Sequence, residues 1–337
     1  MKIFAGHDES GCAWYRVLMP LGELGKHGHQ VTMVSANLSQ GGGATRETMA
    51  EHDVVVAQRW DSHAGLGTWR RLKATSKLVY ETDDDVFSVE PVNWPAYSQF
   101  AREDVRDAVR HSLEVADLVT VSSAPLADVM REHNPNVAVL PNVIPGMVLD
   151  LPAPAGDRPA IGWHGGASHG LDIQVVGQPL RRFLDKHPGW DAVLFGQDYR
   201  PTVRHERCGY IPWLHVNDNP AGFYGSLDWD IGLAPVQYTE FNKSKSYIKC
   251  LEYAARGIPV IATDIEPYRE FVLHGVTGFL VKGDHEWFKY MCELAADEGL
   301  RQSMGEKAKE HARQFTIEGN WHRWEDAYRK LLPEGVT

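Results

Sequence analysis

The sequence predicts an α/β protein built from two doubly wound, Rossmann-like halves. Apolar runs of strand length alternate with helical segments, a proline-rich stretch interrupts the alternation once, and the alternation then starts again. Strands that alternate with helices form βαβ units around a parallel sheet. The chain has 337 residues, which is enough for two domains of about 150 residues each.

The first half opens with a strand at Lys2–Ala5, and the apolar residues between Val17 and Leu24 then recur at helical spacing. Further short runs rich in β-branched residues predict strands at Gln30–Val34, Val54–Ala57, Leu78–Tyr80 and Leu118–Val121. Helical patterns cover Arg102–Val115 and Pro125–His133. The pattern therefore predicts the first doubly wound sheet.

The segment Pro141–Pro159 holds five prolines and little periodicity, a composition typical of a linker. After it, strands are predicted at Ala160–Trp163, Ala192–Phe195, Ile231–Ala234 and Pro259–Ala262. Helices are predicted at Tyr247–Arg256 and Trp287–Ala296. The aromatic stretch Ile317–Leu332 predicts a last helix that packs on its own domain or across another surface.

Charge and cysteine usage narrow the class of protein. The formal net charge is −11, which disfavours general attraction to nucleic acid or anionic lipid. The scattered Cys12, Cys208, Cys250 and Cys292 form no CxxC pair, which favours free thiols in a reducing compartment. The first residues do not resemble a signal peptide, and no apolar run reaches the length of about 20 residues that spans a bilayer. We therefore expect a cytoplasmic protein without a transmembrane segment.

The segment Phe241–Asp264 carries the strongest chemical signal. Hydroxyl and basic residues lie before and at the start of a predicted helix, whose free N–H groups and positive dipole end could bind a phosphate. The residues expected near this phosphate are Lys243, Ser244, Lys245, Ser246 and Lys249. Glu252 lies further along the helix and could accept hydrogen bonds from ribose hydroxyls. An amphipathic surface helix with solvated lysines is the alternative.

The segment Ile161–Asp172 is a strand, a Gly-Gly loop and a helix start. Gly165 and Gly166 would let the backbone approach a ligand closely, and His164 and His169 could donate to a phosphate. The spacing is neither a G-x-G-x-x-G fingerprint nor a Walker A loop, and a tight strand-to-helix turn needs glycines anyway.

Two loops of the first half are further candidates. The loop Gly6–Arg16, which includes Gly11 and Arg16, follows the first strand, where open α/β sheets bind ligands. A plain connection is the alternative. Three aspartates, Asp83, Asp84 and Asp85, follow another strand and could bind a cation, orient acceptor hydroxyls or cap the next segment. No histidine or cysteine spacing predicts a metal site.

Taken together, these segments resemble a GT-B fold glycosyltransferase, close to the retaining family-4 enzymes. The resemblance is carried in order by Ala116–Ile144, Ser226–Val236, Phe241–Asp264 and Glu270–Val281. The usual family motif has two glutamates separated by seven residues. Glu252 matches the second, whereas Ser244 stands at the first. The usual Gly-Arg-Leu…Lys-Gly element is replaced by GWHGGASH.

The resemblance implies two domains that face each other across a cleft, with residues 1–145 on the acceptor side and 146–314 binding the nucleotide sugar. Residues 315–337 would return to the N-terminal domain. A UDP- or GDP-sugar would be the co-substrate, and no metal or other cofactor would be obligatory. Glu252 would bind ribose, while Lys245, Ser246 and the Gly165–Gly166 loop would hold the diphosphate. Asp83 and Asp84 would orient the acceptor hydroxyl.

The implied reaction is glycosyl transfer with retention, in which the leaving phosphate takes the acceptor proton. The alternatives are a GT-B nucleotide-sugar 2-epimerase and a nucleotide-sugar-binding protein without catalysis, and a dinucleotide-dependent oxidoreductase is less favoured. The acceptor could be a saccharide, a lipid-linked sugar, a small molecule or modified phage DNA. Basic and aromatic residues that could bind nucleic acid lie together at Arg59–Trp60 and Trp69–Lys73. However, residues 1–150 carry about 13 Lys or Arg against about 20 Asp or Glu.

Overall fold

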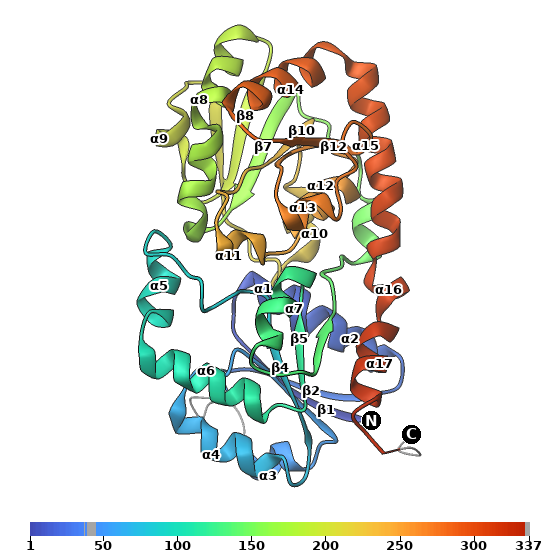
Figure 1. Cartoon of the computed structure of the whole chain (residues 1–337). Helices are drawn as coiled ribbons and strands as arrows, with labels where there is room; N and C mark the ends of the chain where they lie inside the picture. The colour runs from blue at the N-terminus through green and yellow to red at the C-terminus, as the bar shows by residue number, and fades with distance from the viewer. Residues whose placement is uncertain (37, 39–44, 334–337) are drawn as a thin grey trace. The chain divides into compact units, whose positions relative to one another are not determined.

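The computed structural model describes residues 1–36, 38 and 45–333, which divide into two compact units (Figure 1). The first unit comprises Met1–Val143, Ser244–Ser246 and the chain from Ile317 onward. The second unit comprises Ile144–Lys243 and Tyr247–Thr316. Each unit contains one six-stranded sheet in which every strand pair is parallel. The predicted α/β class with two doubly wound sheets is thus confirmed.

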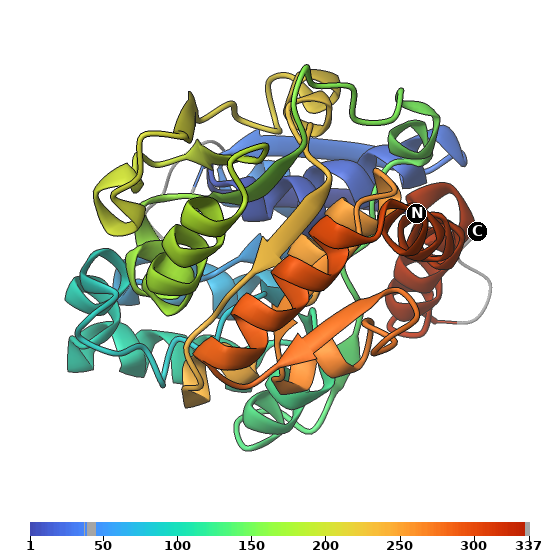
Figure 2. The ribbon, with the colours of Figure 1, turned by 90° about the horizontal axis from the view of Figure 1, so that it is seen from above.

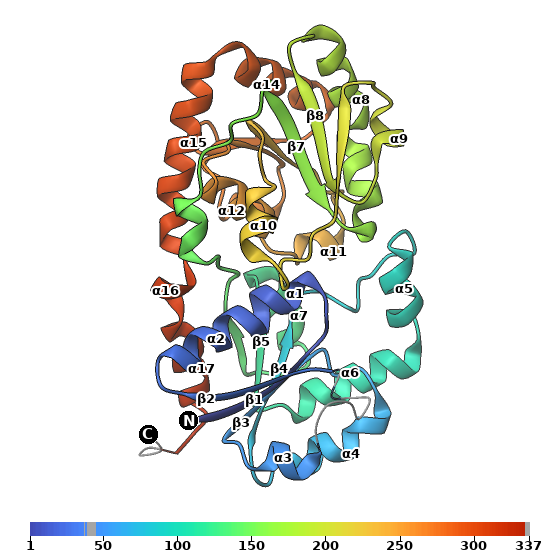
Figure 3. The same cartoon turned by 180° about the vertical axis from the view of Figure 1, so that it is seen from behind.

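The first sheet has the strand order β2-β1-β3-β4-β5-β6 (Figures 1 and 3). Its strands are β1 (Lys2–His7), β2 (Gln30–Ser35), β3 (Val54–Gln58), β4 (Lys77–Thr82), β5 (Leu118–Val121) and β6 (Val137–Val139). Its helices include α1 (Gly11–Ala13), α2 (Met19–Lys26), α3 (Arg46–Ala50), α4 (His63–Leu72), α5 (Trp94–Phe100), α6 (Glu103–Val115) and α7 (Ala124–Arg131). The central strand β3 is buried throughout and is apolar from Val54 to Ala57, because helices cover both faces of such a sheet.

Residues 317–329 form two short helices, α16 (Ile317–Asn320) and α17 (His322–Arg329), where one helix was predicted. Trp324 and Tyr328 of α17 are fully buried within the first unit. The ring of Trp321 stacks on His27 at the end of α2, with ring centroids 3.7 Å apart. Residues 334–337, the end of the predicted C-terminal segment, lie outside the described residues.

The second sheet has the strand order β12-β11-β10-β7-β8-β9. Its strands are β7 (Ala160–Gly165), β8 (Asp191–Gly196), β9 (Cys208–Pro212), β10 (Ile231–Ala234), β11 (Val260–Thr263) and β12 (Gly278–Val281). Its helices include α8 (Gly170–Lys186), α9 (Arg200–Val203), α10 (Pro220–Gly225), α11 (Glu240–Lys243), α12 (Ile248–Ala255), α13 (Glu266–Arg269), α14 (Asp284–Ala296) and α15 (Glu298–Ala312). Helix α8 packs against α14 (Figure 2). Trp163 and Trp287 are buried in their shared core.

Three strands were not predicted, namely β6, β9 and β12, and all three lie at an edge of their sheet. Edge strands are covered on fewer sides, so their sequences need not be uniformly apolar. In β9 only Cys208 is buried, and Gly209 and Pro212 are exposed. The mixed composition of β9 explains why the apolar pattern did not reveal it. Strands β6 (Val-Ala-Val) and β12 (Gly-Phe-Leu-Val) are apolar but only three and four residues long, which is too short for a clear pattern.

The predicted linker Pro141–Pro159 is partly structured. Val143 and Ile144 are fully buried, and Gly146–Asp150 form a 3₁₀ turn. The amide of Ile144 donates to the carbonyl of Phe315 at 3.0 Å. The two units divide between Val143 and Ile144 and again between Thr316 and Ile317. The sequence did not predict that Ser244–Ser246 belong to the first unit while their chain neighbours belong to the second.

Candidate functional site

Polar residues gather at the carboxyl ends of the strands of the first sheet. Asp8 follows β1, Arg59 follows β3, the aspartates Asp83–Asp85 follow β4, and Ser122–Ser123 follow β5. In open parallel sheets, ligands bind at this edge. The structure therefore brings the predicted Asp83 and Asp84 together with Asp8, which lies in the candidate loop Gly6–Arg16, and with Arg59, which was predicted only as a possible nucleic-acid contact.

Arg59 is the centre of this group. Its Nη2 lies 2.7 Å from Asp83 Oδ1 and 3.2 Å from Asp84 Oδ2, and its Nη1 lies 3.5 Å from Asp8 Oδ2. Its backbone is left-handed, with φ 56°, a conformation that costs roughly 1–2 kcal/mol for a residue with a Cβ. A strained residue that holds three carboxylates is typical of a functional site.

The three aspartates after β4 have different environments. Burial alone would raise the pKa of Asp83, but Arg59 and a hydrogen bond with Cys12 outweigh it and lower this pKa to about 2. Burial and the neighbouring Asp83 raise the pKa of the Cys12 thiol well above its usual value, so this thiol stays protonated. Asp85 accepts from the Phe87 amide at 3.0 Å and from Ser88 Oγ at 2.5 Å. It therefore caps the next turn, as one alternative predicted.

Lys245 lies beside this group in the first unit. Its Nζ is 3.1 Å from Asp84 Oδ1. The flanking residues are tied to the same unit, because Ser123 Oγ donates to the Ser244 carbonyl and Asn142 Nδ2 donates to Ser246 Oγ. Helix α12 begins at Ile248, so Ser244 and Ser246 precede the helix start rather than form it.

Arg16, a predicted ligand contact, is instead buried inside the first unit. Its guanidinium donates to both carboxylate oxygens of Glu81, at 2.7 and 3.1 Å. It also donates to the Leu140 carbonyl at 2.5 Å and to Asn142 Oδ1 at 2.9 Å. These contacts give Arg16 a structural role that differs from the expected one. The other candidate in that loop, Gly11, begins α1 and has open space where a Cβ would lie.

Replacing Arg16 by methionine is expected to destabilise the protein by about 3–5 kcal/mol, because it leaves the Glu81 carboxylate buried without its partner. Urea unfolding of the variant measures the loss. Arg46→Met, which removes an exposed pair with Glu47, is the matched control and should change stability by less than about 0.5 kcal/mol. Unchanged stability in Arg16→Met would contradict the structural role.

In the second unit, helix α12 holds the end of β7 through three side chains. Lys249 Nζ donates to the His164 carbonyl, and the His164 amide donates to the Tyr253 hydroxyl at 3.2 Å. Glu252 Oε2 lies 2.9 Å from His164 Nε2, and both side chains are buried. Four of the predicted residues, counting Gly165 at the end of the strand, therefore meet at one place.

The His164 ring is surrounded by aromatic side chains, with the rings of Tyr253 and Phe223 at 5.3 and 5.8 Å. Burial and then the charge of Lys249 lower the pKa of His164, so the imidazole is neutral at pH 7. Its Nδ1 has no hydrogen-bond partner among the described residues. A neutral, partly unsatisfied histidine offers a hydrogen bond to a ligand but no positive charge for a phosphate.

The two glycines after β7 differ in their surroundings. A Cβ on Gly165 would lie 2.5 Å from the Trp163 ring, so packing alone requires this glycine. A Cβ on Gly166 would meet nothing within 4 Å. The next predicted residue, His169, has its Nδ1 2.8 Å from Asp172 Oδ2. Asp172 also accepts from the Gln237 amide at 3.1 Å and so joins this loop to the one after β10.

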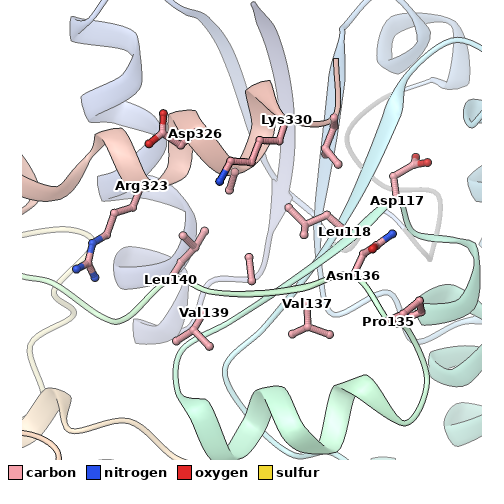
Figure 4. Close-up of a pocket in the computed structure, with 13 residues that line it drawn as sticks. Asp117, Leu118, Pro135, Asn136, Val137, Val139, Leu140, Arg323, Asp326 and Lys330 are labelled. Carbon is pink, nitrogen blue, oxygen red and sulfur yellow. The ribbon is translucent and has the colours of Figure 1, made fainter. Parts of the chain in front are cut away.

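A pocket of about 700 Å³ lies in the first unit, along the edge strand β6 and helix α17 (Figure 4). Arg323, Asp326 and Lys330 line it on the helix side, and Val137 and Val139 on the strand side. It contains none of the predicted site residues.

The described parts of the chain lack a metal-ligand cluster and a helix that could cross a membrane. Within residues 1–36, 38 and 45–333, no three His, Cys, Asp or Glu side chains gather so that they could hold a metal ion. No helix within those same ranges combines the length and the apolar character needed to cross a membrane.

Solved structures with the same architecture cover nearly the whole chain. A sucrose-phosphate synthase from Thermosynechococcus elongatus matches with a TM-score of 0.68 at 16% identity, over 98% of this chain and 99% of that one. The Anabaena protein Alr3699/HepE, solved in complex with UDP, matches with a TM-score of 0.67 at 16% identity, over 98% and 99% of the two chains. The chain has the GT-B fold.

Comparisons of sequence also find glycosyltransferases, in agreement with the GT-B fold of this chain. Residues 248–311, from α12 into α15, match the family described as glycosyl transferases group 1. The D-inositol 3-phosphate glycosyltransferase of Corynebacterium jeikeium is 24% identical over 266 residues, which are 69% of this chain and 62% of that protein. The chain thus spans less than two thirds of the curated relatives it matches. The resemblance to GT-B glycosyltransferases of the family-4 type is confirmed.

Proposed function

We propose that the chain is a glycosyltransferase that moves a sugar from a nucleoside diphosphate sugar to an acceptor hydroxyl. The observation that carries the proposal is the meeting of α12 with the end of β7. Lys249, Glu252 and Tyr253 converge there on His164. The helix that supplies them opens the segment that matches the glycosyltransferase family. The complexes of the Anabaena protein with UDP and UDP-glucose favour a uridine nucleotide, with GDP as the second choice.

In this proposal the second unit holds the donor. Glu252 accepts hydrogen bonds from the ribose hydroxyls, and the loop at Gly165–Gly166 approaches the diphosphate. The first turn of α12 directs its N–H groups at the phosphates. Lys249 secures the loop, because it bonds the His164 carbonyl.

The first unit supplies the acceptor side, where Asp83 and Asp84 orient the acceptor hydroxyl. During transfer, the bond between the anomeric carbon and the phosphate oxygen breaks, and the acceptor oxygen bonds to that carbon. The acceptor attacks from the same face that the phosphate leaves, and the departing phosphate oxygen takes its proton, so the configuration is retained. Negative charge grows on the leaving diphosphate. The amides of α12 and the ammonium of Lys245 stabilise it without an obligatory metal ion.

The proposal is tested by incubating the protein with UDP- and GDP-sugars and a mixture of hydroxyl acceptors, and by measuring nucleotide release and glycosylated product. We expect one donor to be consumed with formation of a new glycoside. Recovery of an epimerised donor sugar, or nucleotide binding without consumption, would contradict glycosyl transfer and would favour the epimerase or the binding protein.

Gly166→Ala tests the contact between the loop and the diphosphate. The new methyl group meets nothing within 4 Å, so thermal stability should stay unchanged. It would occupy the room left for the phosphates, and we expect nucleotide affinity to fall by about tenfold, the equivalent of about 1.4 kcal/mol.

Calorimetric titration with UDP or GDP measures this affinity. The matched control is Gly189→Ala, which adds a methyl group in equally open space of the same unit. Equal affinities in the two variants would remove Gly166 from the donor site.

A further inference from the structure

We propose that the acceptor is an uncharged polyol, such as a saccharide or a cyclitol without phosphate groups, and that phosphorylated and polyanionic acceptors are excluded. This inference rests on the proposed glycosyl transfer and deepens it on the acceptor side. It is carried by the charges and by the unsatisfied hydrogen-bonding groups at the carboxyl ends of the first sheet.

The two cations discussed at this edge are already engaged. Arg59 contacts the carboxylates of Asp8, Asp83 and Asp84. Lys245 contacts Asp84 and, in the proposed transfer, serves the donor diphosphate rather than a phosphate of the acceptor. Three carboxylates therefore face two cations. Arg16 lies deeper in the same unit and is paired with Glu81. The sequence from 36 to 45 contains no Lys or Arg.

A phosphate would have to displace an aspartate from Arg59 or Lys245 and would face the remaining carboxylates at close range. Two like charges about 4 Å apart repel by about 4 kcal/mol at an effective dielectric constant of 20. A phosphate dianion also has no proton to donate to these carboxylates, whereas each hydroxyl of a polyol has one.

Three buried groups at the same edge lack a hydrogen-bond partner among the described residues, namely Gln58 Nε2, Ser122 Oγ and Arg59 Nε. Gln58, at the end of β3, is 5% exposed. Its Oε1 accepts from the Asp8 amide at 3.2 Å, and its Nε2 has no partner among the described residues. Ser122 Oγ, just after β5, is also buried, and the described residues supply no partner for it. An unmade hydrogen bond of this kind costs about 1–3 kcal/mol, so a ligand oxygen that accepts from Gln58 is favoured.

These groups together fit a hydroxyl better than any other ligand oxygen. A hydroxyl accepts from the Gln58 amide and donates to an aspartate at the same time. The pattern of donors and carboxylates therefore selects for several neutral hydroxyls, and the paired cations select against a phosphate.

The inference is tested with matched acceptor pairs, namely myo-inositol with an inositol monophosphate, and glucose with glucose 6-phosphate, together with a short DNA duplex that carries hydroxymethylated bases. Nucleotide release above donor hydrolysis is measured for each, and ligand-observed NMR measures acceptor binding without donor. We expect the neutral member of a pair to be preferred by about tenfold or more, which corresponds to about 1.4 kcal/mol.

Three results would each overturn the inference. The phosphorylated member of a pair could be used as well as or better than the neutral member, or the DNA could stimulate nucleotide release. The third is that no acceptor of either pair binds to the protein or stimulates nucleotide release. If the protein neither binds nor consumes a nucleotide sugar, the proposed function itself fails. That failure can be distinguished from a failure of the acceptor inference, because acceptor binding is measured in the absence of the donor.

Asp84→Asn provides a second test. It removes a carboxylate that neutralises both Arg59 and Lys245, so the ratio of phosphorylated to neutral acceptor binding should rise by about tenfold. The ratio is readable even if turnover falls. Asp128→Asn, which changes an exposed carboxylate of α7 in the same unit, is the control. An unchanged ratio in Asp84→Asn would contradict the proposed exclusion of phosphate.

Discussion

Replacing Glu252 by alanine is expected to weaken the binding of UDP or GDP by roughly 10- to 100-fold. Hydrogen bonds to a charged group contribute about 1.5–3 kcal/mol, and this variant would remove those to the ribose. Glu252 is buried beside His164 at the end of β7. Calorimetric titration of the nucleotide without its sugar isolates this contact from the chemistry of transfer.

Two further variants sharpen the test of Glu252. Glu252→Gln keeps the shape of the side chain and one accepting oxygen, so its affinity should lie between those of the wild type and the alanine variant. Glu270→Ala removes an exposed glutamate of the same unit and should leave affinity unchanged. Wild-type affinity in Glu252→Ala would remove this residue from the donor site.

Lys245→Ala is expected to lower turnover by about 10²- to 10³-fold while the nucleotide dissociation constant changes only severalfold. A charge that interacts with the leaving diphosphate is worth most when negative charge has developed in the transition state. The ammonium is already held by Asp84 at 3.1 Å, so little reorganisation is required of it. Steady-state kinetics and nucleotide titration together separate the two effects.

The control for this variant is Lys243→Ala, which removes the same charge two residues away. The sequence placed Lys243 near the phosphate, but in the structure it lies at the end of α11 and pairs with exposed Glu240. We expect its turnover to match that of the wild type. A loss of nucleotide affinity that fully accounts for the loss of activity in Lys245→Ala would contradict the transition-state role.

The general fold was predictable because a parallel sheet leaves a clear pattern in sequence. Buried strands such as Val54–Gln58 read as apolar runs, and the helices between them recur regularly. The edge strand β9 was missed because its partial exposure permits a mixed composition, and β6 and β12 were missed because their apolar runs are only three and four residues long. The joining of Ser244–Ser246 to the first unit was also missed, since it depends on Ser123 and Asn142, more than one hundred residues away in sequence.

The candidate site was only partly predictable for the same reason. His164, Lys249 and Glu252 lie in segments with recognisable local order, and the structure brings them together. The place of Arg16 depends on Glu81 and Asn142, which no local pattern links to it. Arg59 was predicted only as a possible nucleic-acid contact, although a charged residue directly after a buried strand also indicates a place at the carboxyl edge of the sheet.

A crystal structure of the protein soaked with its nucleotide sugar tests the central claim most directly. We predict that the ribose hydroxyls lie within hydrogen-bond distance of the Glu252 carboxylate and that the diphosphate lies against Gly166 and the first turn of α12. Clear density for the nucleotide elsewhere, with the surroundings of Glu252 and Gly166 unaltered, would contradict it.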